Sequence, residues 1–165
     1  MPKFKLRLNP ESVEEVLKGV TDYQKKVKRS GPELTKQLTE QGVSLAQQNA
    51  SYMDIYDSGE LVNGIEAEYV GAFKTETAIG KVHSTARHSA FCEFGTGVVG
   101  AGSPHPDPIP GWIYDVNEHG EEGWFYYDKN GVKRWTKGMP SRPYMYDTAR
   151  MLRSRIIPTA KEVLK

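Results

Sequence analysis

The order of apolar and polar residues predicts helices at both ends of the chain. Residues 9–27 open with Asn-Pro-Glu, a typical helix start, and then place apolar side chains three and four positions apart on one helical face. Residues 30–32 read Ser-Gly-Pro and predict a break, because proline has no N–H to donate to the preceding turn. A second helix is therefore expected over residues 33–50. A third, long helix should start at Pro143 and be kinked at Pro158.

Alternating apolar and polar residues, rich in β-branched and aromatic side chains, predict short strands. The expected strands are residues 4–8, 61–69, 78–83, 112–116, 124–127 and 132–135. Four of them should pair as two hairpins, one through residues 71–75 and one through the Asp-Lys-Asn-Gly turn at 128–131. A short helical turn is expected over 86–92, whereas residues 95–111, with five glycines and four prolines, should be irregular.

These elements predict an α+β fold. A mainly antiparallel sheet of four or more strands is expected to be packed by two N-terminal helices and one long C-terminal helix. The proline-rich loop and the aromatic β-hairpin form an insert, residues 98–138. With 165 residues, the chain is expected to be a single domain, residues 1–165, that includes this insert.

Composition excludes several classes of function. The chain has 22 basic and 21 acidic residues, and its net charge of +1 provides no global field toward DNA or an anionic membrane. No apolar run reaches the length of about 18 residues that spans a bilayer, and the N-terminus lacks the apolar core of a signal peptide. The single cysteine, Cys92, cannot form an internal disulfide and is expected to be a small buried apolar side chain. These features predict a soluble protein of the cytosol.

Candidate catalytic and cofactor patterns are weak. Residues 95–100 read Gly-Thr-Gly-Val-Val-Gly and match the dinucleotide fingerprint by letters, but that fingerprint needs a helix after its glycines. The prolines between 104 and 110 oppose such a helix, so nucleotide binding is not expected. The chain has four histidines, His83, His88, His105 and His119, and those beside possible metal-binding carboxylates, His105 and His119, are expected to be solvated loop residues. A hydrolytic metal site is the less favoured alternative, formed by His105, Asp107, Glu118 and His119. No catalytic, metal or cofactor residues are predicted, and no enzyme is expected.

Aromatic residues of the insert form a candidate interface between subunits: Trp112, Tyr114, Trp124, Tyr126 and Trp135. Beside two basic residues, such side chains could also make a stacking platform for bases or sugars. Acidic residues lie close by in the sequence and the net charge is near neutral, so packing or a protein interface is favoured.

Three short motifs resemble a known family when they are taken in order. Residues 90–97 read Ala-Phe-Cys-Glu-Phe-Gly-Thr-Gly, and residues 142–145 read Arg-Pro-Tyr-Met. Upstream, residues 57–61 read Asp-Ser-Gly-Glu-Leu, although Glu60 stands where the family usually has a basic residue. This set resembles the tail-component family of long-tailed phages, which includes neck or tail-completion proteins similar to lambda's minor tail protein Z. The insert is longer than in the compact members of that family.

The resemblance implies a structural protein of the virion without enzymatic activity. It would complete the phage tail and join it to the head as a hexameric ring, after synthesis in the cytoplasm of a bacterial host. Its partners would be its own copies and other neck and tail proteins (head-closure protein, tail terminator and tail tube). DNA would only pass through the lumen, and no membrane would be contacted. A tail terminator or a head-closure ring protein is the alternative within this class. A nucleic-acid-binding or DNA-processing protein is the alternative from another class.

The motifs that flank the insert are expected to act as a hinge that anchors it: Glu93, Phe94, Gly95, Thr96, Gly97, Arg142 and Pro143. Glycine permits close backbone approaches, and the residue before a proline is held extended. Glu93 and Arg142 are expected to form a charge-assisted pair that pins both ends of the insert. The insert itself should project as an arm onto a neighbouring subunit or the tail.

Overall fold

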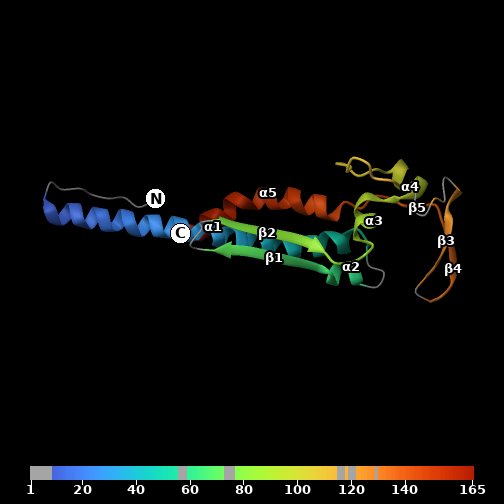
Figure 1. Cartoon of the computed structure of the whole chain (residues 1–165), viewed down its shortest axis with the longest axis horizontal. Coiled ribbons are helices and arrows are strands. Elements are labelled where there is room, and N and C mark those ends of the chain that lie inside the picture. The colour runs from blue at the N-terminus through green and yellow to red at the C-terminus, as the bar shows by residue number, and fades with distance from the viewer. Residues whose placement is uncertain (1–8, 56–58, 73–76, 115–117, 119–121, 129) are drawn as a thin grey trace. The chain divides into compact units, whose positions relative to one another are not determined.

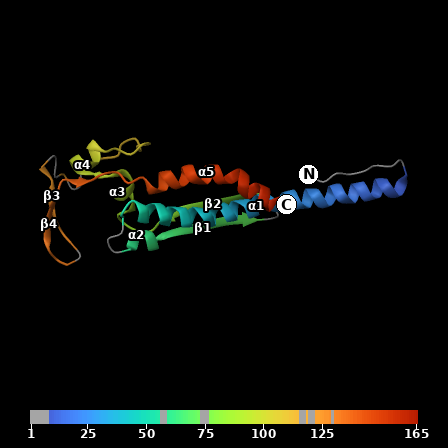
Figure 2. The same cartoon turned by 180° about the vertical axis from the view of Figure 1, so that it is seen from behind.

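The structure is a computed structural model that describes residues 9–55, 59–72, 77–114, 118, 122–128 and 130–165 (Figures 1 and 2). It is a mixed α+β structure with a long N-terminal helix, a C-terminal helix and two small antiparallel sheets, which confirms the predicted class. The chain divides into two compact units. The first contains Met1–Gln41, Ala67–Lys81 and Ser154–Lys165, and the second contains Gly42–Glu66 and Val82–Arg153. The single-domain assignment stays a prediction.

One continuous helix, α1 (Pro10–Tyr52), replaces the two N-terminal helices expected from the sequence. Its start is as predicted, because the Asn9 side chain accepts a hydrogen bond from the Ser12 N–H at 3.2 Å. The break expected at residues 30–32 is absent, and Pro32 lies inside the helix. Proline removes one helical hydrogen bond, but its fixed φ suits a helix, and the Pro32 ring is fully buried. Burial of the ring therefore offsets the lost bond.

In the first unit, α1 packs between a hairpin and the end of the C-terminal helix. The hairpin is formed by β1 (Ile65–Ala72) and β2 (Thr77–Ser84), and the C-terminal helix is α5 (Tyr144–Val163). The hydroxyl of Tyr69 donates to the Pro32 carbonyl at 3.1 Å, and Gln41 donates to the Thr159 hydroxyl at 3.4 Å. Gly80 faces Thr39 so closely that any side chain at position 80 would overlap the threonine hydroxyl.

The second unit contains the apolar core. Its buried members are Ala46, Ala50, Ile55, Leu61, Ile65, Ala86, Cys92 and Tyr144. Leu61 enters this core from α2 (Glu60–Asn63), so the strand predicted over residues 61–69 starts four residues late. Gly59 is left-handed with a φ of 78° and Gly64 donates back to the Glu60 carbonyl, and this glycine pair fixes a helical turn instead. Burial of Cys92 confirms its expected apolar role.

In the described residues, four strands form two separate two-stranded sheets and not one sheet of four or more, and the short strand β5 (Gly138–Met139) belongs to neither sheet. Besides β1 and β2, the strand β3 (Trp124–Tyr127) pairs antiparallel with β4 (Lys133–Thr136). Each pair is a local hairpin, and a long stretch of helical turns and prolines separates the two, so the strands of one do not continue the other. The expected strands at 78–83, 124–127 and 132–135 are confirmed within a residue or two.

Several predictions concern the stretch between the sheets. The helical turn expected near 86–92 is α3 (Ser89–Phe94). Residues 95–111 are not irregular throughout, because α4 (Gly97–Gly102) forms one and a half turns before the first proline. Residues 112–114 are not a strand. The strand expected at 4–8, most of the turn at 71–75 and part of the strand at 112–116 lie outside the described residues. Within the described ranges, every helix is too short or too polar to cross a bilayer.

Candidate functional site

The turn after α3 brings both ends of the insert onto the second unit. Gly95 ends α3 with a φ of 80°, which favours glycine, and its N–H donates to the Phe91 carbonyl at 2.8 Å. A side chain at Gly95 would press on the backbone of Ser141 and Met139. This close approach places the start of the insert directly beside the chain that leaves it.

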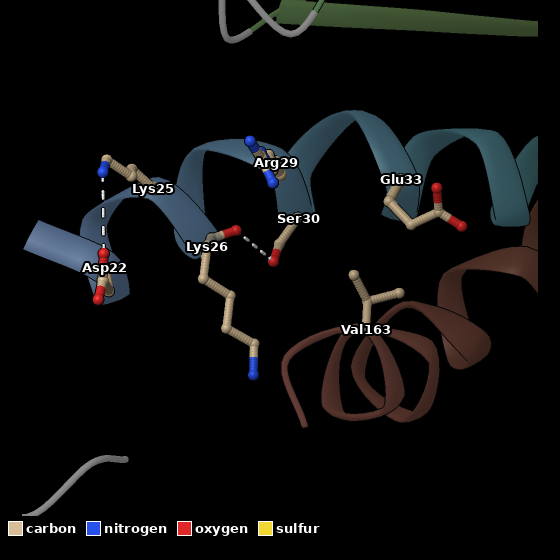
Figure 3. A pocket seen from close by; sticks show the side chains of 7 residues that line it. All are labelled: Asp22, Lys25, Lys26, Arg29, Ser30, Glu33 and Val163. Atoms are coloured by element: carbon tan, nitrogen blue, oxygen red, sulfur yellow. Dashed lines mark hydrogen bonds and ion pairs between the residues drawn. The ribbon is translucent and has the colours of Figure 1, made fainter. Parts of the chain in front are cut away.

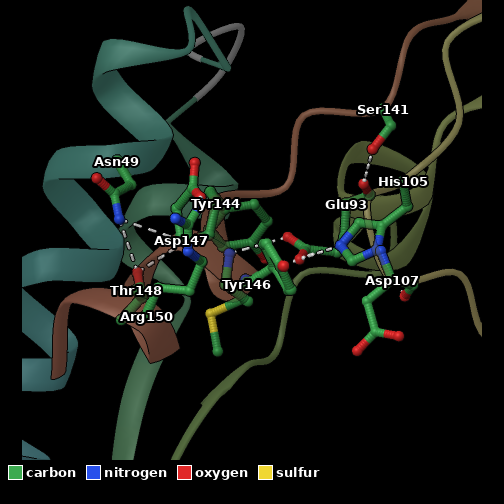
Figure 4. Close-up of polar contacts among 11 residues, drawn as sticks. Asn49, Glu93, His105, Asp107, Ser141, Tyr144, Tyr146, Asp147, Thr148 and Arg150 are labelled. Atoms are coloured by element: carbon green, nitrogen blue, oxygen red, sulfur yellow. Dashed lines mark hydrogen bonds and ion pairs between the residues drawn. The ribbon is translucent and has the colours of Figure 1, made fainter. Parts of the chain in front are cut away.

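A buried carboxylate occupies the centre of this anchor (Figure 4). Glu93 is 7% exposed, and its two carboxylate oxygens accept hydrogen bonds from the backbone N–H groups of Met145 and Tyr146, both at 2.9 Å. These N–H groups belong to the first turn of α5, where no intrahelical acceptor exists and the helix dipole is positive. Glu93 therefore caps α5 from another part of the chain.

The same carboxylate binds His105, which comes from the proline-rich loop. The distance from His105 Nε2 to Glu93 Oε1 is 3.0 Å, and both side chains are at least nine-tenths buried. A carboxylate only accepts hydrogen bonds, so Nε2 carries the proton that is donated to Glu93, while Nδ1 lies 2.9 Å from the N–H and 2.7 Å from the carbonyl of Asp107. The imidazole packs between two aromatic rings, with centroids at 4.7 Å from Phe94 and 5.2 Å from Tyr146. This arrangement ties the proline-rich loop to the start of α5.

The prediction that the side chains of Glu93 and Arg142 form a charge-assisted pair is wrong. Among the described residues, the side chain bound to the Glu93 carboxylate is that of His105, and the same carboxylate also accepts hydrogen bonds from two backbone N–H groups. Arg142 contributes its backbone, whose N–H donates to the Cys92 carbonyl at 2.9 Å. The Ser141 hydroxyl adds a bond to the Glu93 carbonyl at 2.6 Å. The two motifs do meet, through main-chain groups.

Next to the Glu93 anchor, a short ladder of paired backbone joins the two ends of the insert. Thr96 pairs with Met139 and Gly97 pairs with Gly138, both antiparallel. The Met139 N–H also donates to the Thr96 hydroxyl at 3.2 Å. Gly97 and Gly138 have positive φ values of 61° and 103°, and a methyl group on either would overlap a backbone carbonyl. The insert 98–138 is thus closed at its base by paired backbone.

The predicted interface aromatics divide into two groups. Trp112 folds back onto the anchor, where its indole N–H donates to the Gly95 carbonyl at 3.1 Å and its ring lies 5.0 Å from Phe94. Tyr114 and Trp124 are half-buried beside the glycines of α4. Tyr126 and Trp135 stand in the β3–β4 hairpin, 46% and 50% exposed. Of the five predicted residues, Tyr126 and Trp135 have the largest exposed fractions.

Sequence reasoning missed the role of His105, which was expected to be solvated. The sequence feature that could have indicated this role is the position of His105 between Pro104 and Pro106, because the two prolines restrict the backbone conformation around it. Asn49 was missed as well. It is buried in α1 and donates to the Thr148 hydroxyl at 2.9 Å, which fastens α1 to α5 inside the second unit (Figure 4).

An open hollow of about 500 Å³ lies in the first unit, between α1 and the end of α5 (Figure 3). Its lining is charged, with basic residues outnumbering acidic ones: Asp22, Lys25, Lys26, Arg29, Ser30, Glu33 and Val163. No histidine or cysteine takes part in this lining. In the part of the chain that the structure describes, no group of three or more His, Cys, Asp or Glu residues is placed to hold a metal ion.

Comparisons with known proteins give no family for the chain: no family model, no curated protein and no solved structure matches it. The resemblance of its motifs to phage tail-completion proteins remains an expectation, and the geometry of the anchored insert is the observation from which a function can be argued.

Proposed function

We propose that the chain is a structural protein of a phage neck, which completes the tail and joins it to the head as a subunit of an oligomeric ring. The observation that carries this proposal is the insert 98–138. Its base is fixed to the second unit by the Glu93 carboxylate and the backbone ladder, while its hairpin exposes aromatic surface.

The fixed base supports a role in assembly. A long loop that is free to move loses much conformational entropy when it binds a partner, and that loss lowers affinity. Here both ends are held by hydrogen bonds around the buried Glu93 carboxylate and by paired backbone, so the base of the insert is ordered before any partner is met. Such preorganisation favours an arm that docks on a neighbouring subunit.

The β3–β4 hairpin has the composition of a protein interface. Its register sets Phe125 opposite Trp135 and Tyr127 opposite Lys133, so these four side chains share one face. Phe125, Trp135 and Tyr127 are 56%, 50% and 72% exposed. A two-stranded hairpin is marginally stable alone in water, and clustered exposed aromatic residues mark interaction surfaces. A partner would stabilise this hairpin by covering that face.

Nucleic-acid binding is the weaker candidate for the same surface. The hairpin carries Lys133 and Arg134, but Arg134 already pairs with Asp128 at 3.1 Å, and Lys133 lies over the Phe125 ring at 4.3 Å from its centroid. The net charge of +1 adds no general attraction to phosphate. A protein partner is therefore favoured.

The test uses the purified full chain and two matched variants. Phe125→Ser with Trp135→Ser removes the aromatic face, and Val70→Ser with Ile79→Ser removes exposed apolar side chains from the β1–β2 hairpin as the control. Sedimentation velocity and negative-stain microscopy should find rings for the wild type and for the control, but not for the hairpin variant. Rings of unchanged size from the hairpin variant would contradict the arm. A wild-type monomer whose DNA binding weakens steeply with salt would support the alternative class.

Assembly of particles without this chain would separate the related neck functions. Finished tails that fail to join heads support tail completion. Tails of uncontrolled length would support a tail terminator, and filled heads that lose their DNA would support head closure.

A further inference from the structure

Residues 103–112, here called the proline loop, are fixed to the second unit at two points. Near the start of the loop, His105 is held by the buried carboxylate of the anchor at 3.0 Å. At its end, the Trp112 indole N–H donates to the Gly95 carbonyl at 3.1 Å. Each of the first eight positions is a proline or the residue before one, which restricts the backbone throughout. The proline loop is therefore ordered before any partner is met.

Between the two fixed points, the proline loop exposes apolar side chains. Four of them face solvent: Pro106, Pro108, Ile109 and Pro110. The chain turns there, because the Trp112 N–H donates to the Ile109 carbonyl at 3.0 Å and Gly111 has a φ of 84°, the geometry of a turn with proline followed by glycine. Ile109 is 52% exposed on this turn. An ordered apolar loop that stays exposed is typical of an interaction surface.

The aromatic face of the β3–β4 hairpin has the chemistry that binds such a loop. Its three rings stand on one side of the hairpin: Phe125, Tyr127 and Trp135. The rings of Phe125 and Trp135 meet edge to face with centroids 4.7 Å apart, so they form one continuous surface. Proline-rich segments commonly bind to aromatic surfaces, because little conformational entropy is lost when they do so. The hairpin face and the proline loop are therefore complementary apolar surfaces.

The charges beside the two surfaces are opposite. Lys133 is exposed on the aromatic face, with its Nζ 4.3 Å from the centre of the Phe125 ring. Asp107 is exposed among the prolines; it contacts the His105 ring through its backbone, and its side chain points away from that ring (Figure 4). A contact between two hairpins or between two proline loops would bring like charges together, whereas a contact of hairpin with loop brings opposite charges together.

Both surfaces are exposed on the same chain, so a contact between them joins two copies. A closed ring needs two different surfaces on each subunit, one for each neighbour. The hairpin face and the proline loop are such a pair, and both belong to the insert of the second unit.

We propose that the aromatic face of the β3–β4 hairpin of one copy docks on the proline loop of the next copy, with Lys133 beside Asp107. This inference rests on the proposed function, and it names the surface on which the arm docks. The order of the proline loop, which depends on His105 and Trp112, then contributes to the affinity between subunits.

The experiment uses two variants of the full chain that each lose one surface. The hairpin variant is Phe125→Ser with Trp135→Ser. The loop variant is Pro108→Ser with Ile109→Ser, which keeps His105 and the turn at Pro110 and Gly111. Neither variant alone should form rings in sedimentation velocity. An equimolar mixture should form a 1:1 heterodimer and nothing larger, because the intact hairpin of one variant can dock on the intact loop of the other and no second contact remains.

The Kd of this heterodimer, measured by titration calorimetry, tests the pairing of charges. Asp107→Lys in the hairpin variant, or Lys133→Glu in the loop variant, should raise Kd about fivefold, because each replaces an attraction by a repulsion. Both changes together should return Kd to within about twofold of its starting value. As the control, the same changes are exchanged between the variants, where they lie on the surface that is already lost, and Kd should not change.

Circular dichroism and amide hydrogen exchange at Met145 and Tyr146 verify that the variants keep the fold and the anchor. Rings of the loop variant alone would overturn this inference and leave the proposed function intact, since the hairpin would then dock elsewhere, for example on the exposed face of the β1–β2 hairpin. A mixture without the heterodimer, or charge changes that do not restore Kd together, would also overturn it. A wild type that stays monomeric would contradict both the inference and the proposed function, so the two failures can be distinguished.

Discussion

Replacement of Glu93 by glutamine tests the anchor of the insert. In the wild type the buried carboxylate accepts hydrogen bonds from Met145 N–H, Tyr146 N–H and His105 Nε2, all at 2.9–3.0 Å. The amide of Glu93→Gln keeps one oxygen that can accept, but its other end is an NH₂ group that faces a donor. At least one backbone N–H at the start of α5 therefore loses its partner.

The size of the effect follows from those contacts. A hydrogen bond to a charged group contributes about 1.5–3 kcal/mol, and a negative charge near a helix N-terminus adds about 0.3–1 kcal/mol. Loss of one such bond together with the charge predicts a decrease of about 2–4 kcal/mol in the free energy of unfolding. Each kcal/mol lowers Tm by roughly 2–4 °C in a protein of this size.

The assay is thermal and urea unfolding of the full chain, with Glu68→Gln as the control. Glu68 pairs with Lys81 at 3.1 Å, but both side chains are more than half exposed, so its loss should change the free energy of unfolding by less than about 1 kcal/mol. Amide hydrogen exchange at Met145 and Tyr146 should also accelerate in Glu93→Gln alone. If Glu93→Gln were as stable as the control and the two amides kept their protection, the role assigned to this carboxylate would be refuted.

Four further predictions concern single residues. Gly31→Ala should not give the stabilisation of about 0.5–1 kcal/mol that is usual for an exposed helical glycine, because the new Cβ would meet the ring of Pro32 and disfavour the helical conformation; clear stabilisation in urea unfolding would contradict this reasoning. Gly138→Ala should destabilise by about 1–3 kcal/mol, because its φ is 103° and a methyl group would overlap the Thr96 carbonyl, whereas Gly102→Ala, with free space, should unfold like the wild type. Burial is the main cause that raises the pKa of Cys92, so iodoacetamide should alkylate this thiol only after unfolding; rapid alkylation of the native chain would contradict its place in the core. Burial likewise raises the pKa of Tyr144 to about 12. Burial of the neutral phenol therefore stabilises the fold fully below pH 10, and this contribution is lost between pH 10 and 12 as the phenol ionises in the unfolded state. Absorbance titration should find one tyrosine that ionises late, and Tyr144→Phe should abolish this late step.

Local patterns in the sequence predicted much of the fold. The Asn9 cap, the β2 strand and the β3–β4 hairpin each depend on residues close together in the chain, and all three are confirmed. The continuous α1 was not predicted, because the tolerance of Pro32 depends on burial of its ring in the folded chain. The same holds for α2, where two glycines and the core set a turn that the apolar pattern alone reads as a strand.

The anchor was predicted in part. The sequence indicated that the segments around Glu93 and Arg142 meet, because both motifs flank one long insert. It did not identify the partner of the carboxylate. Arginine is the usual partner by charge, but the carboxylate instead binds backbone N–H groups at the start of α5 and a histidine that stands between two prolines. Such a choice depends on the three-dimensional path of the chain and not on residue types.

Photo-crosslinking from the hairpin tests the central claim of an assembly arm most directly. Tyr127 is the most exposed aromatic residue of β3 and β4, at 72%, and can be replaced by benzoylphenylalanine without loss of a core contact. On irradiation, rings of this variant should yield covalent links between the hairpin of one subunit and the body of the next, up to the full ring. Rings that form without such links, or a monomer that links to DNA, would contradict the account.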